Sequence, residues 1–311
     1  TFNIDWDLSI KEYLGQEVVP DSGCGSWLLE PQSTNTVFYS EAFAEWSSIG
    51  SITLTDGQLA PDGTLGATKI SGTIGSSYIV LGASSSTTAT RTIYAKTVSG
   101  TGTAKLMSYY GNTNNLFTLT EQWQRFELNN TASSSGLSTF YAADFRGSGT
   151  LTEYLVWGAN ATNNQDYATS YIPSNGTSVT RNQDVCTNGG SLASINSTEG
   201  VLYAEIAALS DDGTFRVISL NSGDNTNVVK LGYRTTSNAI YYEVRSGNVS
   251  QSFQIYTTTD IKEFHKVALL YKENDFKLFV NGVNVLSDTS GSTPIGLNNL
   301  SFEANSGAYF Y

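Results

Sequence analysis

Residues 157–184, WGANATNNQDYATSYIPSNGTSVTRNQD, close one β-rich part of the chain and lead into another. The four residues before Gly158 are mostly β-branched or aromatic, which favours a strand, and Gly158 should end it. Because Pro173 cannot donate to a β-ladder, the extended segment around it should lie at a sheet edge or at the end of a strand. The Asn-Gly step at 175–176 then favours a turn. The stretch therefore predicts a β-rich domain that ends here.

The same stretch resembles a pattern that recurs in phage virion proteins and in some marine bacterial surface proteins, approximately WGAQ-E-YATSYIPT-TR-AD. The segments LLEPQSTN at 28–35 and YSEAF at 39–43, followed by Trp46, resemble the LLLEPQ-TN-YSE-F-W opening of the same modules. The chain departs from the pattern at residues 160–164, which lack its usual acidic residue, so no role is assigned to that carboxylate. The matching positions in the stretch are Trp157, Gly158, Ala159, Tyr167, Ala168, Thr169, Ser170, Tyr171, Ile172, Pro173, Thr180, Arg181 and Asp184.

The composition of the chain also favours β-structure. Only 14% of its residues are charged and 12% are aromatic, while Gly, Ser, Thr and Asn separate short hydrophobic runs. At 311 residues, the chain is long enough for two domains, each with its own core. We therefore expect an all-β protein of two tandem antiparallel β-sandwiches. The predicted strands include 92–96, 106–110, 121–128, 201–206, 215–220, 228–233, 239–244 and 253–256.

The clearest secondary-structure signal lies at residues 264–283. Apolar and polar residues alternate in FHKVALLY at 264–271 and in FKLFVNGV at 276–283, which predicts a β-hairpin. The second run should turn at Asn281-Gly282. These residues resemble the WHHVA...LYVNG hairpin of laminin G-like and concanavalin A-like sandwiches. The resemblance implies one more strand after residues 302–311, supplied either by sequence beyond this chain or by another chain through strand addition.

These resemblances divide the chain into four parts. A lead-in segment covers residues 1–27, and a jelly roll similar to carbohydrate-binding modules covers 28–184. A short linker at 185–194 precedes a laminin G or concanavalin A-like sandwich at 195–311, which lacks its last strand. Because the sequence starts without Met and stops inside a predicted strand, we expect it to be a portion of a longer protein.

Charge and hydropathy exclude several classes of partner. The net charge of −12 argues against binding to nucleic acid or to anionic membrane surfaces. No apolar run approaches the ~20 residues that span a bilayer, so membrane insertion is not expected. Polar, hydroxyl-rich partners such as glycans stay open.

The two cysteines of the chain, Cys24 and Cys186, are too few for a disulfide scaffold and wrongly spaced for zinc. If the first and last strands of the first domain are neighbours, the two could form a disulfide. The alternative is that both are unpaired small hydrophobic residues.

Residues that common hydrolytic mechanisms need are scarce. His265 is the only histidine and lies in the predicted hairpin, where a structural role is favoured. No G-x-S-x-G elbow is present for a serine nucleophile. The second domain also lacks the closely spaced acidic residues that a concanavalin A-like glycosidase places on one strand. We therefore predict a non-enzymatic protein.

A glycan site needs an aromatic platform and a few polar groups for the sugar hydroxyls. One member of each adjacent pair, Tyr109-Tyr110 and Tyr241-Tyr242, should face outward, and Arg234 and Arg245 lie near the second pair. The strand at 121–128 resembles the W-R strand of carbohydrate-binding jelly rolls. Sandwich interiors also take large aromatic residues, and this alternative is favoured for Trp123 and Trp157. The candidate glycan-binding residues are Tyr109, Tyr110, Trp123, Arg125, Tyr167, Tyr241 and Tyr242.

Calcium is a common structural ion in both resembled families, so the resemblance implies a structural calcium site. No ordered ligand loop such as an EF-hand is present, and solvated acidic residues in turns are the simpler alternative. The candidate oxygen donors are Asp144, Glu153, Asp184, Asp211, Asp212 and Asp224.

Three functions are compatible with these observations. The resemblances imply a non-enzymatic surface component of the virion of a tailed phage, which recognises polysaccharide on the host envelope. An alternative is a structural capsid decoration or head-fibre protein that binds other virion proteins and forms a homo-oligomer. A third is the binding portion of a secreted polysaccharide-degrading enzyme whose catalytic domain lies elsewhere.

Overall fold

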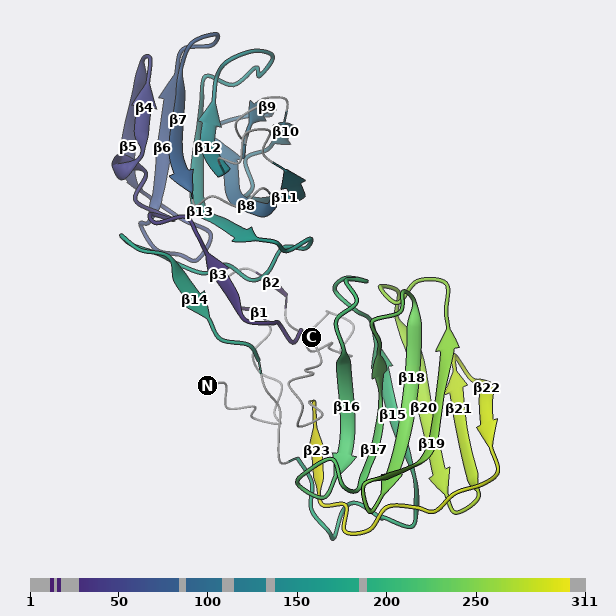
Figure 1. Cartoon of the computed structure of the whole chain (residues 1–311). Coiled ribbons are helices and arrows are strands. Elements are labelled where there is room, and N and C mark those ends of the chain that lie inside the picture. Colours follow the sequence, from purple (N-terminus) through teal and green to yellow (C-terminus); the bar gives the residue numbers. More distant parts are fainter. Residues whose placement is uncertain are drawn as a thin grey trace. The chain divides into compact units, whose positions relative to one another are not determined.

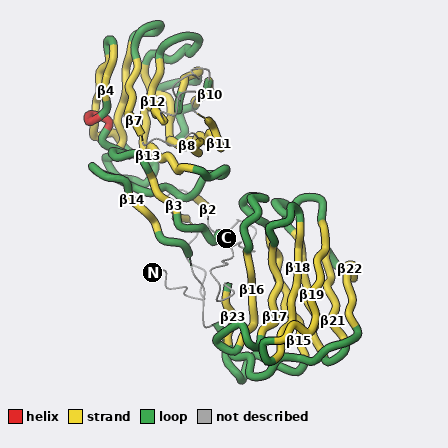
Figure 2. Tube along the Cα trace, viewed as in Figure 1, coloured by secondary structure: helices red, strands yellow, loops and turns green. Residues whose placement is uncertain are grey.

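The computed structural model describes residues 12–13, 16–17, 28–83, 88–107, 115–132, 138–184 and 189–302. The chain divides into two compact units, Thr1–Asn182 and Gln183–Tyr311. Apart from one 3-10 turn at Phe43–Glu45, the regular structure of the described residues consists of strands (Figures 1 and 2). Every pairing between these strands is antiparallel, for example in both large sheets of each unit. The prediction of an all-β, antiparallel protein is confirmed. Among the described residues, no helix is long and apolar enough to cross a membrane.

The first unit contains a sandwich of two five-stranded sheets (Figure 1). One sheet has the strand order β10-β9-β12-β7-β4 and the other has the order β11-β8-β13-β6-β5. Two smaller pairings, β1 with β2 and β3 with β14, complete the unit. Its strands are β1 (Glu12–Tyr13), β2 (Gln16–Glu17), β3 (Ser33–Asn35), β4 (Ser47–Ile49), β5 (Ile52–Gln58), β6 (Ala67–Gly72), β7 (Tyr78–Ala83), β8 (Thr88–Thr97), β9 (Gly102–Lys105), β10 (Leu116–Leu119), β11 (Gln124–Ala132), β12 (Ser138–Asp144), β13 (Glu153–Asn163) and β14 (Val179–Arg181).

Alternation along the central strands separates the core of the first unit from its outer face. In β8, Ile93 and Ala95 are buried in the core between the two sheets, together with Phe140 of β12 on the facing sheet. Tyr94, which lies between them in sequence, belongs to a separate cluster with Trp157. Successive side chains of a strand point to opposite faces, so this second cluster lies on the outer face of the sheet.

The expectation that Gly158 ends a strand is wrong. Strand β13 continues to Asn163, and its pairing with β8 shifts register between Trp157 and Asn160. Gly158 has a φ of 65°, a left-handed conformation that glycine adopts easily and that is common in β-bulges. The bulge keeps Trp157 on the outer face and returns Ala159 to the core.

The predicted strand at 106–110 is also misplaced. The strand of this region is β9, which ends at Lys105. Met107 has a φ of 54°, which a non-glycine residue adopts at a turn and not inside a strand. Residues 108–110 lie outside the described part of the chain.

The second unit is a sandwich of a four-stranded sheet, β15-β20-β21-β22, and a five-stranded sheet, β19-β18-β17-β16-β23 (Figure 1). Its core contains Leu231 and Tyr242 from the larger sheet and Leu269 and Leu278 from the smaller sheet. The strands are β15 (Glu199–Ile206), β16 (Arg216–Asn221), β17 (Val228–Tyr233), β18 (Ala239–Ser246), β19 (Val249–Thr257), β20 (His265–Lys272), β21 (Asp275–Val280), β22 (Val283–Asp288) and β23 (Asn299–Ser301).

The hairpin predicted at 264–283 is present as β20 and β21. Lys272 pairs with Asp275, so two residues form the turn between the strands. The next turn is at Asn281 and Gly282, which have φ values of 50° and 82°, as the favoured two-residue hairpin turn requires. The further strand implied after residues 302–311 stays a prediction, because residues 303–311 lie outside the described residues.

Candidate functional site

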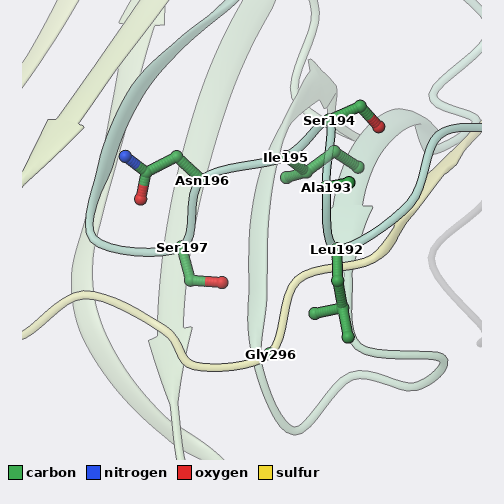
Figure 3. A pocket seen from close by; sticks show the side chains of 7 residues that line it. All are labelled: Leu192, Ala193, Ser194, Ile195, Asn196, Ser197 and Gly296. Carbon is green, nitrogen blue, oxygen red and sulfur yellow. The ribbon is translucent and has the colours of Figure 1, made fainter.

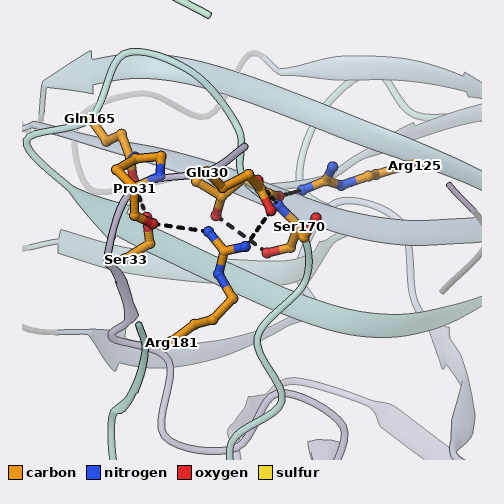
Figure 4. Close-up of polar contacts among 8 residues, drawn as sticks. Glu30, Pro31, Ser33, Arg125, Gln165, Ser170 and Arg181 are labelled. Atoms are coloured by element: carbon orange, nitrogen blue, oxygen red, sulfur yellow. Dashed lines mark hydrogen bonds and ion pairs between the residues drawn. The ribbon is translucent and has the colours of Figure 1, made fainter. Parts of the chain in front are cut away.

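The two segments that carry the phage-like pattern meet in the first unit (Figure 4). The Glu30 carboxylate forms an ion pair with the Arg181 guanidinium and accepts a 2.6 Å hydrogen bond from the backbone N–H of Ser170. Arg181 also donates to the backbone oxygen of Pro31 over 3.0 Å. Because Glu30 and Arg181 are 151 residues apart in sequence, these contacts join the start of the unit to its end.

Asn35 makes a second set of contacts between the same two segments, and it is fully buried. Its side-chain nitrogen donates to the backbone oxygens of Ala159 and Ile172 over 3.3 and 2.8 Å. Its side-chain oxygen accepts from the backbone N–H groups of Val37 and Ala161, each over 3.0 Å. One side chain therefore forms hydrogen bonds with four backbone groups. Without these partners, the buried groups would destabilise the fold.

Tyr171 adds an aromatic contact to these polar ones. Its hydroxyl lies 2.7 Å from Ser40 Oγ and donates to the Glu41 carboxylate over 2.7 Å. Its ring centroid lies 4.6 Å from that of Trp157. Burial, with a further contribution from Glu41, raises the pKa of the Tyr171 hydroxyl well above its usual value, so the hydroxyl stays protonated. We call the four residues Glu30, Asn35, Tyr171 and Arg181 the clasp.

Tyr171 of the clasp packs against an aromatic cluster on the outer face of the first sandwich. Tyr94 of β8 lies opposite Trp157 of β13 in the register, and their ring centroids are 5.3 Å apart. Only 1% of the Trp157 surface is exposed, so Trp157 is buried as expected, but it lies in the outer-face cluster beside Tyr171 and not between the two sheets. Arg125 of β11 pairs with Tyr94 in the register, donates to the backbone oxygen of Thr169 and forms a 3.3 Å ion pair with Glu127. Arg125 therefore binds other parts of the protein.

The other sequence-predicted residues of the first unit are only partly accessible or not described. Trp123 is half-buried against the Tyr94 and Trp157 cluster, and the Lys96 ammonium group lies 5.6 Å from its ring centroid. Tyr167 is half-buried. Tyr109 and Tyr110 lie outside the described residues.

In the second unit, the adjacent tyrosines separate as alternation requires. Tyr242 points into the core and is fully buried, and its hydroxyl lies 2.9 Å from Ser252 Oγ. The prediction that Tyr242 binds a glycan is therefore wrong, because the packed core excludes ligand. Tyr241 points to the outer face of the five-stranded sheet. It packs against Val217 across Gly232, which has no side chain and pairs with both in the register.

Tyr241 forms the floor of an exposed aromatic cluster around Arg234. The Arg234 guanidinium carbon lies 5.0, 5.5 and 5.6 Å from the ring centroids of Phe253, Phe215 and Tyr241. Phe253 of β19 is 42% exposed, and Phe215, just before β16, is 36% exposed. We call these four residues the aromatic–arginine patch. The sequence candidates included Tyr241, with Arg234 nearby, but missed both phenylalanines. Alternation in β19 predicts that Phe253 and Ile255 lie on one face of the sheet. It does not predict that Phe253 lies beside Tyr241, because that depends on the register between strands.

A charged row lies next to the patch on the same face of the sheet. Glu243 of β18 pairs in the register with Lys230 of β17 and with Phe253 of the patch. Its carboxylate accepts from Lys230 Nζ over 2.8 Å and from Arg245 Nε over 2.7 Å. Burial acts to raise the pKa of the Glu243 carboxyl, but the two cations outweigh it and lower the pKa below its usual value. Glu243 is therefore a fixed anion beside the patch.

The calcium candidates Asp144 and Glu153 of the first unit have protein partners. The buried Asp144 accepts two hydrogen bonds from Arg146, of 2.8 and 2.9 Å. Glu153 forms a 3.3 Å ion pair with Lys69. Asp184, two residues after the first unit ends, is half-buried.

The calcium candidates of the second unit are also hydrogen-bonded. Asp211 accepts from the hydroxyl of Ser237. Asp212 accepts two 2.9 Å hydrogen bonds from Arg216, and Asp224 accepts one of 2.8 Å from a backbone N–H two residues later. In the described part of the chain, no three His, Cys, Asp or Glu side chains gather as a metal site would require. Calcium binding stays a prediction.

His265 is buried at the start of β20, and both ring nitrogens are engaged. Nδ1 donates to the backbone oxygen of Glu263 over 2.7 Å, and Nε2 lies 2.7 Å from the Thr258 hydroxyl. These contacts explain its conformation without any catalytic partner. Cys24 and Cys186, by contrast, fall outside the described residues.

A surface hollow of about 390 Å³ lies before β15 in the second unit (Figure 3). None of its lining residues carries a titratable side chain, so the hollow offers no acid, base or nucleophile. Its lining consists of Leu192, Ala193, Ser194, Ile195, Asn196, Ser197 and Gly296.

The geometry therefore leaves the aromatic–arginine patch as the best candidate for a binding site. No protein-family model matches the chain, and no curated protein sequence matches it either. Among solved structures, the chain is similar to domains LG4-5 of the mouse laminin alpha1 chain. The sequence identity is 10% and the TM-score is 0.27, over 75% of this chain and 83% of that one.

Proposed function

We propose that the chain is a non-enzymatic, glycan-binding protein of a virion surface, and that the aromatic–arginine patch is its binding site. The virion setting is supported by the sequence resemblance of residues 28–46 and 157–184 to phage virion proteins. The exposed phenylalanines of the patch support a glycan as the ligand. In a sequence with this resemblance, the ligand is polysaccharide of the host envelope or of the surroundings.

The exposure of Phe215 and Phe253 carries the proposal. A pyranose has an apolar face of C–H groups that packs against an aromatic ring, while its hydroxyls need hydrogen-bonding partners close by. The sheet holds both rings through its strands, so little conformational freedom is lost when a sugar binds. Arg245 lies in the charged row next to the patch with its side chain 32% exposed, and it can serve hydroxyls at the edge of the patch.

The test is binding of the purified chain to a panel of bacterial-envelope and marine polysaccharides, with calcium and with a chelator. Phe253→Ala should weaken saturable binding by about tenfold or more, because such aromatic anchors typically contribute more than 1.4 kcal/mol. Tyr203→Ala is the matched control, since Tyr203 is equally aromatic and 58% exposed, on the other sheet. Loss of binding with calcium removed would support the calcium prediction.

Two results would count against the proposed site. Full binding by Phe253→Ala together with loss in Tyr203→Ala would move the site to the four-stranded sheet. No binding to any polysaccharide, from a chain shown to be folded, would reject glycan recognition.

A second function is favoured by the outer face of β15, β20 and β21. In the register, Val201 lies opposite Leu270, and Ala268 lies between Tyr203 and Phe279. Val201 and Tyr203 are each 58% exposed. Contiguous exposed apolar residues mark protein interaction sites, so this face supports the alternative of a structural virion protein that binds a second copy or another virion protein. Sedimentation of the wild type and of Tyr203→Ser over a range of concentrations tests it. Self-association lost in the variant supports the alternative, and a monomer at all concentrations leaves no role for this face in self-association.

A further inference from the structure

Arg234 differs in its partners from five other arginines of the described residues. Among the described residues, it has no carboxylate within 4.0 Å and its guanidinium donates no hydrogen bond. Its Nε is buried without an acceptor. By contrast, carboxylates within 4.0 Å pair with Arg125, Arg146, Arg181, Arg216 and Arg245.

The aromatic rings around Arg234 hold its guanidinium in place but provide no acceptors for its N–H groups. Aromatic rings attract a guanidinium through their faces, yet they offer no acceptor for its five N–H donors. The carboxylate beside the patch is already engaged, because Glu243 pairs with Lys230 and Arg245. A donor set left without acceptors in a partly buried position favours an anionic ligand.

We propose that the patch recognises an acidic glycan, in which the carboxylate of a sugar accepts a bidentate pair of hydrogen bonds from Arg234. A planar carboxylate matches the planar guanidinium fork, and the apolar face of the same sugar packs on Phe253 or Phe215. This inference rests on the proposed glycan-binding function and adds the chemical class of the ligand. It also explains how a chain with a net charge of −12 binds an anion, since a short-range pair acts where long-range repulsion is screened by salt.

The first experiment needs no variant. Binding of the wild-type chain to a polyuronate oligosaccharide is compared with binding to the same oligosaccharide after its carboxyl groups are reduced to alcohols. We expect the reduced, neutral form to bind at least about tenfold more weakly, because the charge-assisted pair is lost. A glucan sulfate, which is anionic but has no carboxylate, is the third ligand, and binding to this ligand alone would overturn the carboxylate assignment.

The second experiment changes the cation. Arg234→Gln should weaken polyuronate binding by about tenfold or more, and Arg234→Lys should lose less, since an ammonium group keeps the charge but not the fork. Lys266→Gln is the charge-matched control, because Lys266 is exposed on β20 of the other sheet. Circular dichroism and thermal unfolding confirm that each variant is folded.

The outcomes separate the inference from the function on which it rests. Equal binding of the neutral and acidic forms, dependent on Phe253 but not on Arg234, would reject the acidic ligand and keep glycan binding. An equal loss in Lys266→Gln and Arg234→Gln would show a general charge effect and reject the specific pair. Absence of binding to all glycans, neutral and acidic, would reject the proposed function itself.

Discussion

The two sandwiches each place an arginine beside aromatic rings on the outer face of a five-stranded sheet, but they use it differently. In the first unit, Arg125 lies 6.0 Å from the ring centroid of Tyr94 and is held by Glu127 and the backbone of Thr169. In the second unit, the Arg234 guanidinium lies over Tyr241 and donates no hydrogen bond to any described residue. The same residue types therefore stabilise a fold in one unit and stay available to a ligand in the other.

The difference comes from what lies over each face. In the first unit, the chain folds back so that Tyr171 contacts Trp157, and the clasp secures this return with buried hydrogen bonds. In the second unit, Phe215 and Phe253 flank Tyr241 and are themselves exposed. An aromatic cluster is a binding surface only where the chain leaves it open, and its residue types do not show this.

Trp157→Ala should have the largest effect on this comparison. Removal of a fully buried large aromatic side chain costs about 3–5 kcal/mol of unfolding free energy, whereas Phe253→Ala should cost less than about 1.5 kcal/mol because Phe253 is largely exposed. Calorimetry of both variants, with hydrogen exchange to assign each transition to its unit, measures the two effects. Similar losses in the two variants would mean that the outer faces do not differ in their contribution to the fold.

Arg216 of the second unit has a carboxylate partner, so the free energy lost when this pair is broken can be compared with the effect of changing Arg234. Asp212→Ala removes the carboxylate that pairs with the buried Arg216, and the cost should be about 2–3 kcal/mol. This is below the value for a fully buried pair because the Asp212 side chain is 28% exposed. Denaturant unfolding at pH 7 measures it, and Arg234→Gln, which breaks no ion pair, is the comparison.

The same pair should make part of the stability pH-dependent. Burial acts to raise the pKa of the Asp212 carboxyl, but hydrogen bonds from Arg216 and Thr214 outweigh it and lower the pKa below its usual value. A lowered pKa in the folded state means that the stabilisation is complete above the unfolded pKa of about 4 and is lost as the pH falls through the folded pKa. The difference in unfolding free energy between wild type and Asp212→Ala should therefore shrink below about pH 4. A difference that stays constant down to pH 2 would contradict this.

The smallest effect is expected from the two arginines of the comparison. Arg125→Gln removes an ion pair and a hydrogen bond to backbone, and should cost about 1–2 kcal/mol. Arg234→Gln should cost less, about 0.5–1 kcal/mol, since it removes cation–π contacts with the aromatic rings but no hydrogen bond or ion pair within the protein. A thermal-unfolding series of both variants compares them directly. If Arg234→Gln proves the more destabilising, Arg234 has a structural role, and the interpretation that it stays available to a ligand is wrong.

Local sequence patterns predicted the second unit more accurately than the first. Strand β17 begins and ends where the apolar run at 228–233 predicts, and the turn at Asn281-Gly282 follows from residue types that favour positive φ. The errors in the first unit fall at Gly158 and Met107, where a bulge and a left-handed residue interrupt the regular pattern. Such interruptions depend on the register with neighbouring strands, which a single segment does not contain.

Within the candidate site, alternation alone showed that only one of Tyr241 and Tyr242 could face outward. It did not show which one, nor that Phe215 and Phe253 lie beside it. These rings come from three different strands or their ends, and only strand order and register bring them to Arg234. In the first unit, the most recognisable motif residues serve the fold and not a binding site. Arg181 of the clasp, for example, forms an ion pair with Glu30 at the start of the unit.

The amino-acid sequence determined the all-β class, the hairpin at 264–283 and the scarcity of catalytic groups, because composition and short-range periodicity are properties of local segments. Tertiary structure decided which aromatic residues are covered and which guanidinium is left without a carboxylate or a hydrogen-bond acceptor. Both depend on contacts between residues far apart in sequence, such as the 151 residues between Glu30 and Arg181. Burial and pairing are therefore outcomes of the assembled fold, and the candidate site could be recognised only there.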